Sequence, residues 1–79
     1  MNTYGNSKRL VAAIRKEVAA PQVELGLQIA AMVKQHRGTG TDEAIISAMT
    51  ETLVELYGYK PRIVVFVNKI MRIMDSVGE

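Results

Sequence analysis

The sequence contains no cysteine and no tryptophan, and it has only two prolines and one phenylalanine in 79 residues. The absence of cysteine excludes disulfide bonds, thiolate metal sites and a cysteine nucleophile. A chain of this length buries only about 60–65% of the surface that it exposes when unfolded. Without covalent cross-links, a core of this size leaves a stability margin of about 3–5 kcal/mol. Because 48% of the residues are hydrophobic, we expect further stability from assembly into a homodimer or a higher oligomer.

Long apolar runs are also missing. No window contains the roughly 18 apolar residues of a membrane span, because Lys69 and Arg72 interrupt even the most hydrophobic stretch. Charged residues also interrupt every apolar run near the N-terminus, so we expect no secretory signal. These features favour a cytoplasmic protein without a membrane partner.

The periodicity of the apolar residues predicts an all-α, four-helix bundle-like single domain over residues 1–79. Ser7 is a suitable N-cap for a first helix over 8–20, and Pro21 separates it from a second helix over 21–37. In the second helix, the spacing of Gly26 and Ala30 would let a neighbouring helix approach closely. The third and fourth helices are expected over 42–57 and 61–77. Residues 1–6 read as a flexible N-terminal arm, because Gly5 and Asn6 break helices.

The segment over 61–77 organises the predicted fold. At 100° per residue its apolar side chains cover about half of the helical cylinder, and Val65 is the one apolar residue on the polar side. We therefore expect this helix at the centre of the domain and also at a surface that contacts a second copy or another protein. The residues predicted for that interface are Val64, Val67, Met71 and Met74.

Charge is unevenly distributed along the chain. The net charge of +2 does not by itself imply a polyanionic partner, but both ends of the chain are basic and its middle is acidic. This pattern could assist antiparallel docking or docking between subunits, and it could equally be accidental. The basic residues Lys8, Arg9, Arg15 and Lys16 lie on the outer face of the first predicted helix, where they could bind an acidic protein or the phosphates of nucleic acid. A solvated helix face is the simpler interpretation, because no Asn, Gln, Ser or Thr follows Ser7 in this helix to read bases.

The strongest turn signal is the stretch RGTGTDEAII, which begins at Arg37. Gly38 can adopt the left-handed conformation that ends the second helix, and Thr41 can cap the third. A glycine-rich turn entering a helix can also bind an anion, so Arg37, Gly38, Gly40 and Thr41 form a candidate loop site. The structural role is the preferred interpretation, because the stretch matches no established nucleotide-binding signature.

The same ten residues resemble the calcium loop of an annexin repeat, in which a turn between two helices supplies carbonyl ligands. The resemblance implies carbonyl ligands from His36, Gly38 and Gly40, with a carboxylate from Asp75 or Glu79. The remainder of an annexin repeat and its tandem copies are absent from the sequence, so we do not assign the chain to that family and predict no metal.

No nucleophile, base and orienting residue can be assembled from the sequence, and His36 is the only histidine. We therefore predict a protein that is not an enzyme and needs no cofactor. The favoured function is a small binding protein, acting as a regulator, adaptor or stoichiometric inhibitor through association with itself and with another protein. Such compact chains are common among phage and mobile-element genes. The alternative function is nucleic-acid or nucleotide binding by the basic face of an oligomer.

Overall fold

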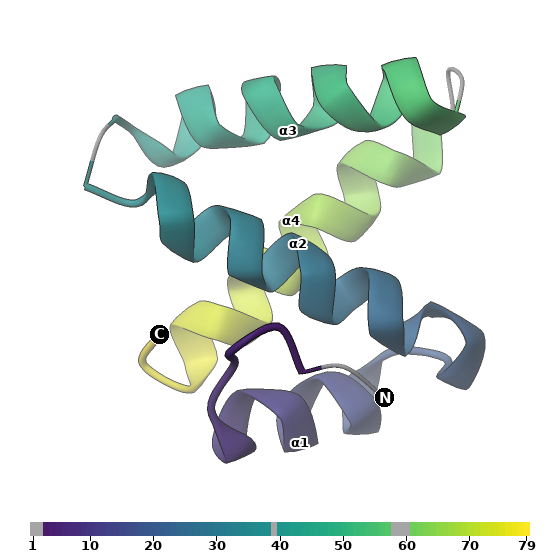
Figure 1. Cartoon of the computed structure of the whole chain (residues 1–79), viewed down its shortest axis with the longest axis vertical. Coiled ribbons are helices and arrows are strands. Elements are labelled where there is room, and N and C mark those ends of the chain that lie inside the picture. Colours follow the sequence, from purple (N-terminus) through teal and green to yellow (C-terminus); the bar gives the residue numbers. More distant parts are fainter. Residues whose placement is uncertain (1–2, 39, 58–60) are drawn as a thin grey trace.

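The computed structural model describes residues 3–38, 40–57 and 61–79. Over these residues the chain forms four α-helices, α1 (Lys8–Glu17), α2 (Val23–His36), α3 (Asp42–Tyr57) and α4 (Pro61–Ser76), with a short 3-10 helix η1 (Ala20–Gln22) before α2 (Figure 1). No strand occurs in the described part of the chain. The prediction of an all-α fold is therefore confirmed.

The helix ends follow the predicted caps. The Ser7 hydroxyl accepts a hydrogen bond from the Leu10 amide at 3.2 Å, and the Thr41 hydroxyl accepts one from the Ala44 amide at 3.2 Å. Gly38 has a φ of +94°, the left-handed conformation expected after α2. The predicted turn at residues 58–60 lies outside the described residues.

The connection between α1 and α2 differs from the prediction. The first helix ends at Glu17 rather than at residue 20, and Val18 is already extended, with φ −115° and ψ 139°. Pro21 lies in η1 near its start, where the missing amide hydrogen costs nothing. Ending α1 early lets the chain reverse direction while Val18 remains in the core with 6% of its surface exposed.

The helices cross one another. In Figure 1, α2 and α4 form an X, with α3 on one side of the crossing and α1 on the other, and α4 contacts all three other helices. At the crossing, a Cβ atom on Gly26 would lie 3.0 Å from Cδ1 of Ile70. The absence of a side chain at Gly26 is therefore what lets α2 and α4 approach so closely, as its spacing with Ala30 predicted.

The burial of α4 corrects the predicted interface. Val67 and Met74 have no exposed surface and Met71 has 5%, so these three side chains belong to the core of a single chain. Of the four predicted residues, Val64 alone is exposed, at 39%. The prediction failed for Val67, Met71 and Met74 because α1, α2 and α3 all pack against α4. Together they cover an apolar face that seemed too wide for two neighbouring helices.

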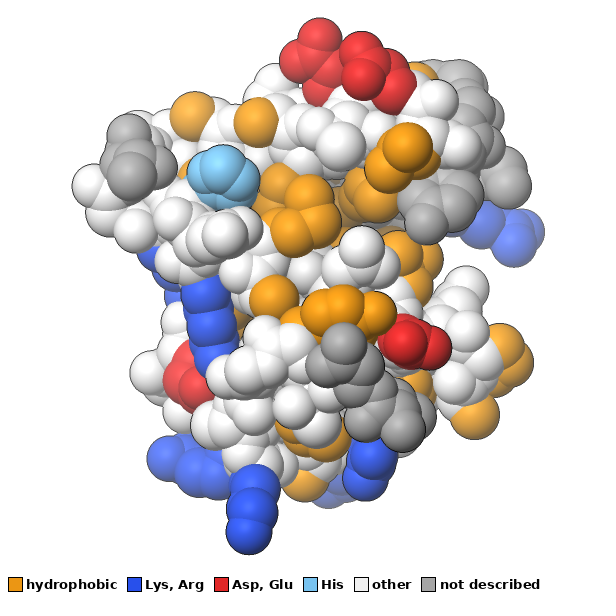
Figure 2. Space-filling view, in the orientation of Figure 1, with side chains coloured by type: hydrophobic (Ala, Val, Ile, Leu, Met, Phe, Trp, Pro, Cys, Tyr) orange, Lys and Arg blue, Asp and Glu red, His pale blue; other side chains and the backbone are white. Residues whose placement is uncertain are grey.

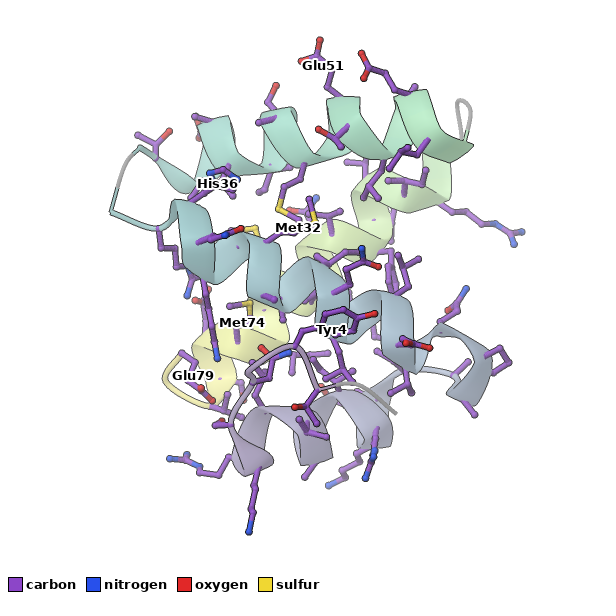
Figure 3. All side chains as sticks on the ribbon, in the orientation of Figure 1. Tyr4, Met32, His36, Glu51, Met74 and Glu79 are labelled. Atoms are coloured by element: carbon purple, nitrogen blue, oxygen red, sulfur yellow. The ribbon has the colours of Figure 1, made fainter. Side chains whose placement is uncertain are left out.

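The described part of the N-terminal arm, residues 3–6, is folded against α2. Asn6 is 9% exposed, and its side-chain amide donates to the carbonyl oxygens of Leu27 at 3.0 Å and Thr3 at 2.7 Å. Tyr4 lies beside α2 (Figure 3), where its hydroxyl donates to Glu24 at 3.2 Å. Residues 3–6, expected as a flexible arm, are therefore packed against α2, because the polar side chain of Asn6 anchors their turn.

Candidate functional site

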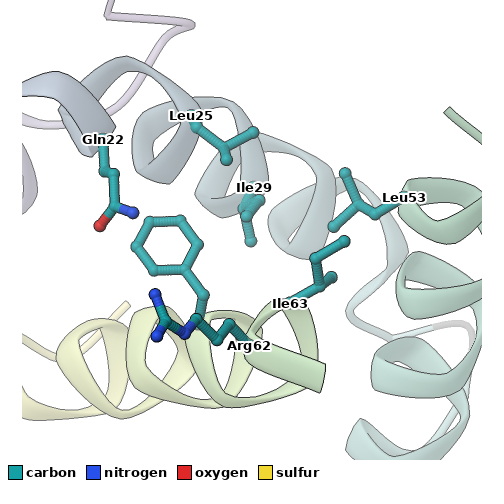
Figure 4. A pocket seen from close by; sticks show the side chains of 7 residues that line it. Gln22, Leu25, Ile29, Leu53, Arg62 and Ile63 are labelled. Carbon is teal, nitrogen blue, oxygen red and sulfur yellow. The ribbon is translucent and has the colours of Figure 1, made fainter. Parts of the chain in front are cut away.

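An open apolar groove lies where α2, α3 and the N-terminal half of α4 meet (Figure 4). Its volume is about 260 Å³, and it has walls from all three helices. Figure 2 shows that hydrophobic side chains also gather in the hollow between α3 and α2. The groove is lined by Gln22, Leu25, Ile29, Leu53, Arg62, Ile63 and Phe66.

The size and lining of this groove restrict what it can hold. It is smaller than the roughly 300–1,000 Å³ of typical small-molecule sites, and its only charged lining residue is Arg62, which is exposed. An apolar groove of this size suits a few hydrophobic side chains of a helix, as in helix-in-groove recognition. Arg62 at its edge would favour a neighbouring carboxylate.

Leu56 extends the apolar surface beyond the groove. It follows Leu53 by one helical turn, about 60° away around α3, but 69% of its surface is exposed whereas Leu53 is 5% exposed. The core-facing side of α3 is thus covered at Leu53 and exposed at Leu56. Leu56 is the most exposed large hydrophobic residue in the described ranges.

The predicted basic residues Lys8, Arg9, Arg15 and Lys16 are all exposed on α1. On α4, Lys69 and Arg72 are also exposed and line a shallow groove with Glu17 at the end of α1. The acidic residues of α3 lie at the opposite end of the molecule, where Glu51 points away from the helix (Figures 2 and 3). The fold therefore converts the charge pattern of the sequence into a basic end and an acidic end.

The candidate loop site is used to hold the chain together. Arg37 binds the Asp75 carboxylate at 2.9 Å and donates a second bond to the backbone oxygen of Glu79. Gly40 and Thr41 are exposed, and the Thr41 hydroxyl caps α3. These contacts favour the structural interpretation of the turn over an anion site.

The same contacts weaken the calcium interpretation. Both carboxylates named for it already bind cationic side chains, Asp75 with Arg37 and Glu79 with Lys34. Among the residues that the structure describes, no group of three or more His, Cys, Asp or Glu side chains could hold a metal ion.

Glu79 joins the ends of three helices. One carboxylate oxygen accepts from the Ser7 hydroxyl at 2.5 Å, and the other lies 3.1 Å from the ammonium of Lys34. The hydrogen bond from Ser7 and then that from Lys34 hold the pKa of the Glu79 carboxyl below its ordinary value. Desolvation opposes this effect, and the positive charges of Lys34 and Arg9 add to it. The charged form of Glu79 thus stabilises the folded chain.

We expect Glu79→Gln to lower the melting temperature slightly at neutral pH and to have a smaller effect in acid, where the Glu79 carboxyl of the wild type becomes protonated. Because the folded-state pKa is lowered, the stabilisation is present above the unfolded value of about 4.3 and is lost as the pH falls through the folded value. Thermal unfolding of both proteins, followed by circular dichroism between pH 3 and 7, measures this difference. Glu51→Gln, at an exposed position on α3, is the control. A difference for Glu79→Gln that persists unchanged at pH 3 would contradict the assignment.

The comparisons with protein-family models, curated proteins and solved structures give no significant match. None of the described helices is long and apolar enough to pass through a membrane. The case for a function therefore rests on the geometry of this chain.

Several residues of the groove were missed by the sequence reasoning. Leu25, Phe66 and Arg62 were not among the residues that the sequence singled out. A helix that is apolar almost all round gives no indication of which flank its neighbours will leave uncovered. That information exists only once the crossing of α2 and α4 is known.

Proposed function

We propose that this chain is a small non-enzymatic binding protein that acts by stoichiometric association, as a regulator, adaptor or inhibitor. Its docking surface is the apolar groove between α2, α3 and α4. The observation that carries the proposal is an open groove with apolar walls beside a leucine that is 69% exposed. Contiguous apolar surface of this kind marks interaction sites in small proteins.

The chemistry of the groove specifies the segment that it binds. The walls from three helices accept apolar side chains spaced by one helical turn, so the bound segment is an amphipathic helix. Arg62 at the edge selects a helix with Asp or Glu beside its apolar face. A partner of this type gains most of its affinity from the buried apolar residues and its orientation from the ion pair.

The test compares capture of partners by the tagged full chain and by two matched variants. Leu25→Lys places a charge in the wall of the groove, whereas Val65→Lys places the same charge at a position that is 65% exposed and absent from the groove lining. We expect a stoichiometric partner that is captured by the wild type and by Val65→Lys but is reduced at least about tenfold with Leu25→Lys, because a buried charge without a partner is costly. Equal capture of the partner by both variants would show that the groove is not its binding site.

A second candidate function is nucleic-acid binding by the basic end. The observation that favours it is the exposure of Lys69 and Arg72 on α4, which adds cations to those of α1. These side chains could neutralise backbone phosphates without reading sequence.

A salt titration tests this second candidate. Binding to a labelled DNA duplex should weaken steeply with salt, and the slope of log affinity against log salt should fall by about 2 in Arg15→Ala/Lys16→Ala. Arg62→Ala removes a cation from the groove and should leave that slope unchanged. Binding that responds equally to both substitutions would indicate non-specific attraction, and the absence of binding at low salt would exclude the function.

A further inference from the structure

We propose that a second copy of this chain occupies the apolar groove in the free protein, by inserting Leu56 at the end of its α3. The two copies would form a two-fold dimer in which each groove receives the leucine of the other copy. The inference rests on the proposed function in one respect, the use of the groove as a docking surface.

The exposed end of α3 has the features that the groove selects. Leu56 is the most exposed large hydrophobic side chain in the described residues, and it belongs to a helix of 16 residues. The neighbouring Glu55 is exposed and could bind Arg62 of the other copy. The apolar side chain of Leu56 and the carboxylate of Glu55 are therefore neighbours. This arrangement suits an apolar groove with a basic residue at its edge.

The groove and Leu56 lie on one continuous surface, because Leu53 lines the groove and Leu56 follows it on the same side of α3. A two-fold interface requires a surface patch that is complementary to itself. Here one patch carries both Leu56, which inserts, and the groove that receives it. The same patch also carries both members of the ion pair, Glu55 and Arg62. Such a patch closes into a dimer and does not propagate into a filament.

The dimer has a consequence for the proposed function. A helix from another protein would have to displace the second copy from the groove. Partner binding and self-association would then compete, and the apparent affinity for the partner would fall as the concentration of this chain rises.

Sedimentation equilibrium of the full chain from micromolar to millimolar concentration tests the inference. The wild type is expected to reach twice the chain mass of 8.7 kDa. Leu56→Asp should raise the dissociation constant by about a hundredfold, because both copies lose a buried leucine. Val65→Asp is the matched control, since it makes the same change at a position of nearly equal exposure, 65% against 69%, and should leave the dimer unchanged. Circular dichroism confirms that the variants keep the helical fold.

A charge exchange tests the orientation of the two copies. Glu55→Arg and Arg62→Glu should each weaken the dimer several-fold, and the double variant should restore it. A wild-type chain that is monomeric at millimolar concentration, or equal effects of Leu56→Asp and Val65→Asp, would overturn the dimer. Failure of the double variant to restore association would overturn the proposed pairing of Glu55 with Arg62. If the wild type is monomeric but Leu25→Lys still loses a captured partner, the proposed function stands and the second copy is excluded.

Discussion

Replacing Ile70 by alanine is expected to lower the free energy of unfolding by about 3 kcal/mol. Ile70 has no exposed surface and lies where α2 and α4 cross, against the position of Gly26. Truncation there removes buried methyl groups and leaves a cavity that crossing helices cannot easily close, for which losses of about 2–5 kcal/mol are typical. A chain of this size has few kilocalories to lose, so the variant should be largely unfolded well below the wild-type melting temperature.

Urea denaturation followed by circular dichroism measures this loss. The control is Val65→Ala on the same helix, where the side chain is 65% exposed and the expected change is within about 0.5 kcal/mol. Comparable losses for the two variants would show that α4 contributes to stability through helix propensity rather than through packing at the crossing.

Replacing Gly26 by valine is expected to destabilise the fold by about 2 kcal/mol or more. A Cβ atom at this position would lie 3.0 Å from Cδ1 of Ile70, 3.3 Å from Cγ2 of Ile14 and 3.6 Å from the ring of Phe66. The two further methyl groups of valine would have to push α1 and α4 away from α2, and overpacking of this kind usually costs about 1–3 kcal/mol.

The matched variants separate crowding from helix propensity. Gly26→Ala requires Cδ1 of Ile70 and the stiffer Cγ2 of Ile14 to move by a few tenths of an ångström. It also gains about 1 kcal/mol of helix propensity, so its net effect should be smaller than that of Gly26→Val. At Gly40 a Cβ atom would meet only the Ala44 side chain, at 3.9 Å, and Gly40→Ala should be close to neutral. Thermal unfolding of the three variants measures the order of their stabilities. Stability of Gly26→Val equal to that of Gly26→Ala would show that the helices are not in close contact here.

The crossing also supports the groove. Phe66 lines the groove and its ring is one of the three groups nearest to the Cβ position of Gly26. A side chain larger than alanine at position 26 would therefore displace a wall of the groove as well as weaken the core. Groove-dependent association should accordingly be more sensitive to Gly26→Val than to any substitution at Val65.

The correct and incorrect predictions have different physical origins. Caps at Ser7 and Thr41 and the left-handed turn at Gly38 depend on local backbone chemistry, which neighbouring residues determine. The prediction that Met71 and Met74 face a partner required knowledge of how many helices would cover α4, and three cover it. For Asn6 the sequence indicated only a helix breaker. Its hydrogen bond to Leu27 could not be predicted, because that bond spans 21 residues and depends on where α2 lies.

The four helices could be predicted without a structure, because hydrophobic periodicity and capping act over a few residues. The sequence also shows the separation of basic and acidic segments along the chain. Which apolar flanks are covered could not be predicted in this way, because coverage depends on the angle at which α2 and α4 cross and on the contact that Gly26 permits. The groove beside Leu53 and the exposure of Leu56 therefore became apparent only from the arrangement of the helices.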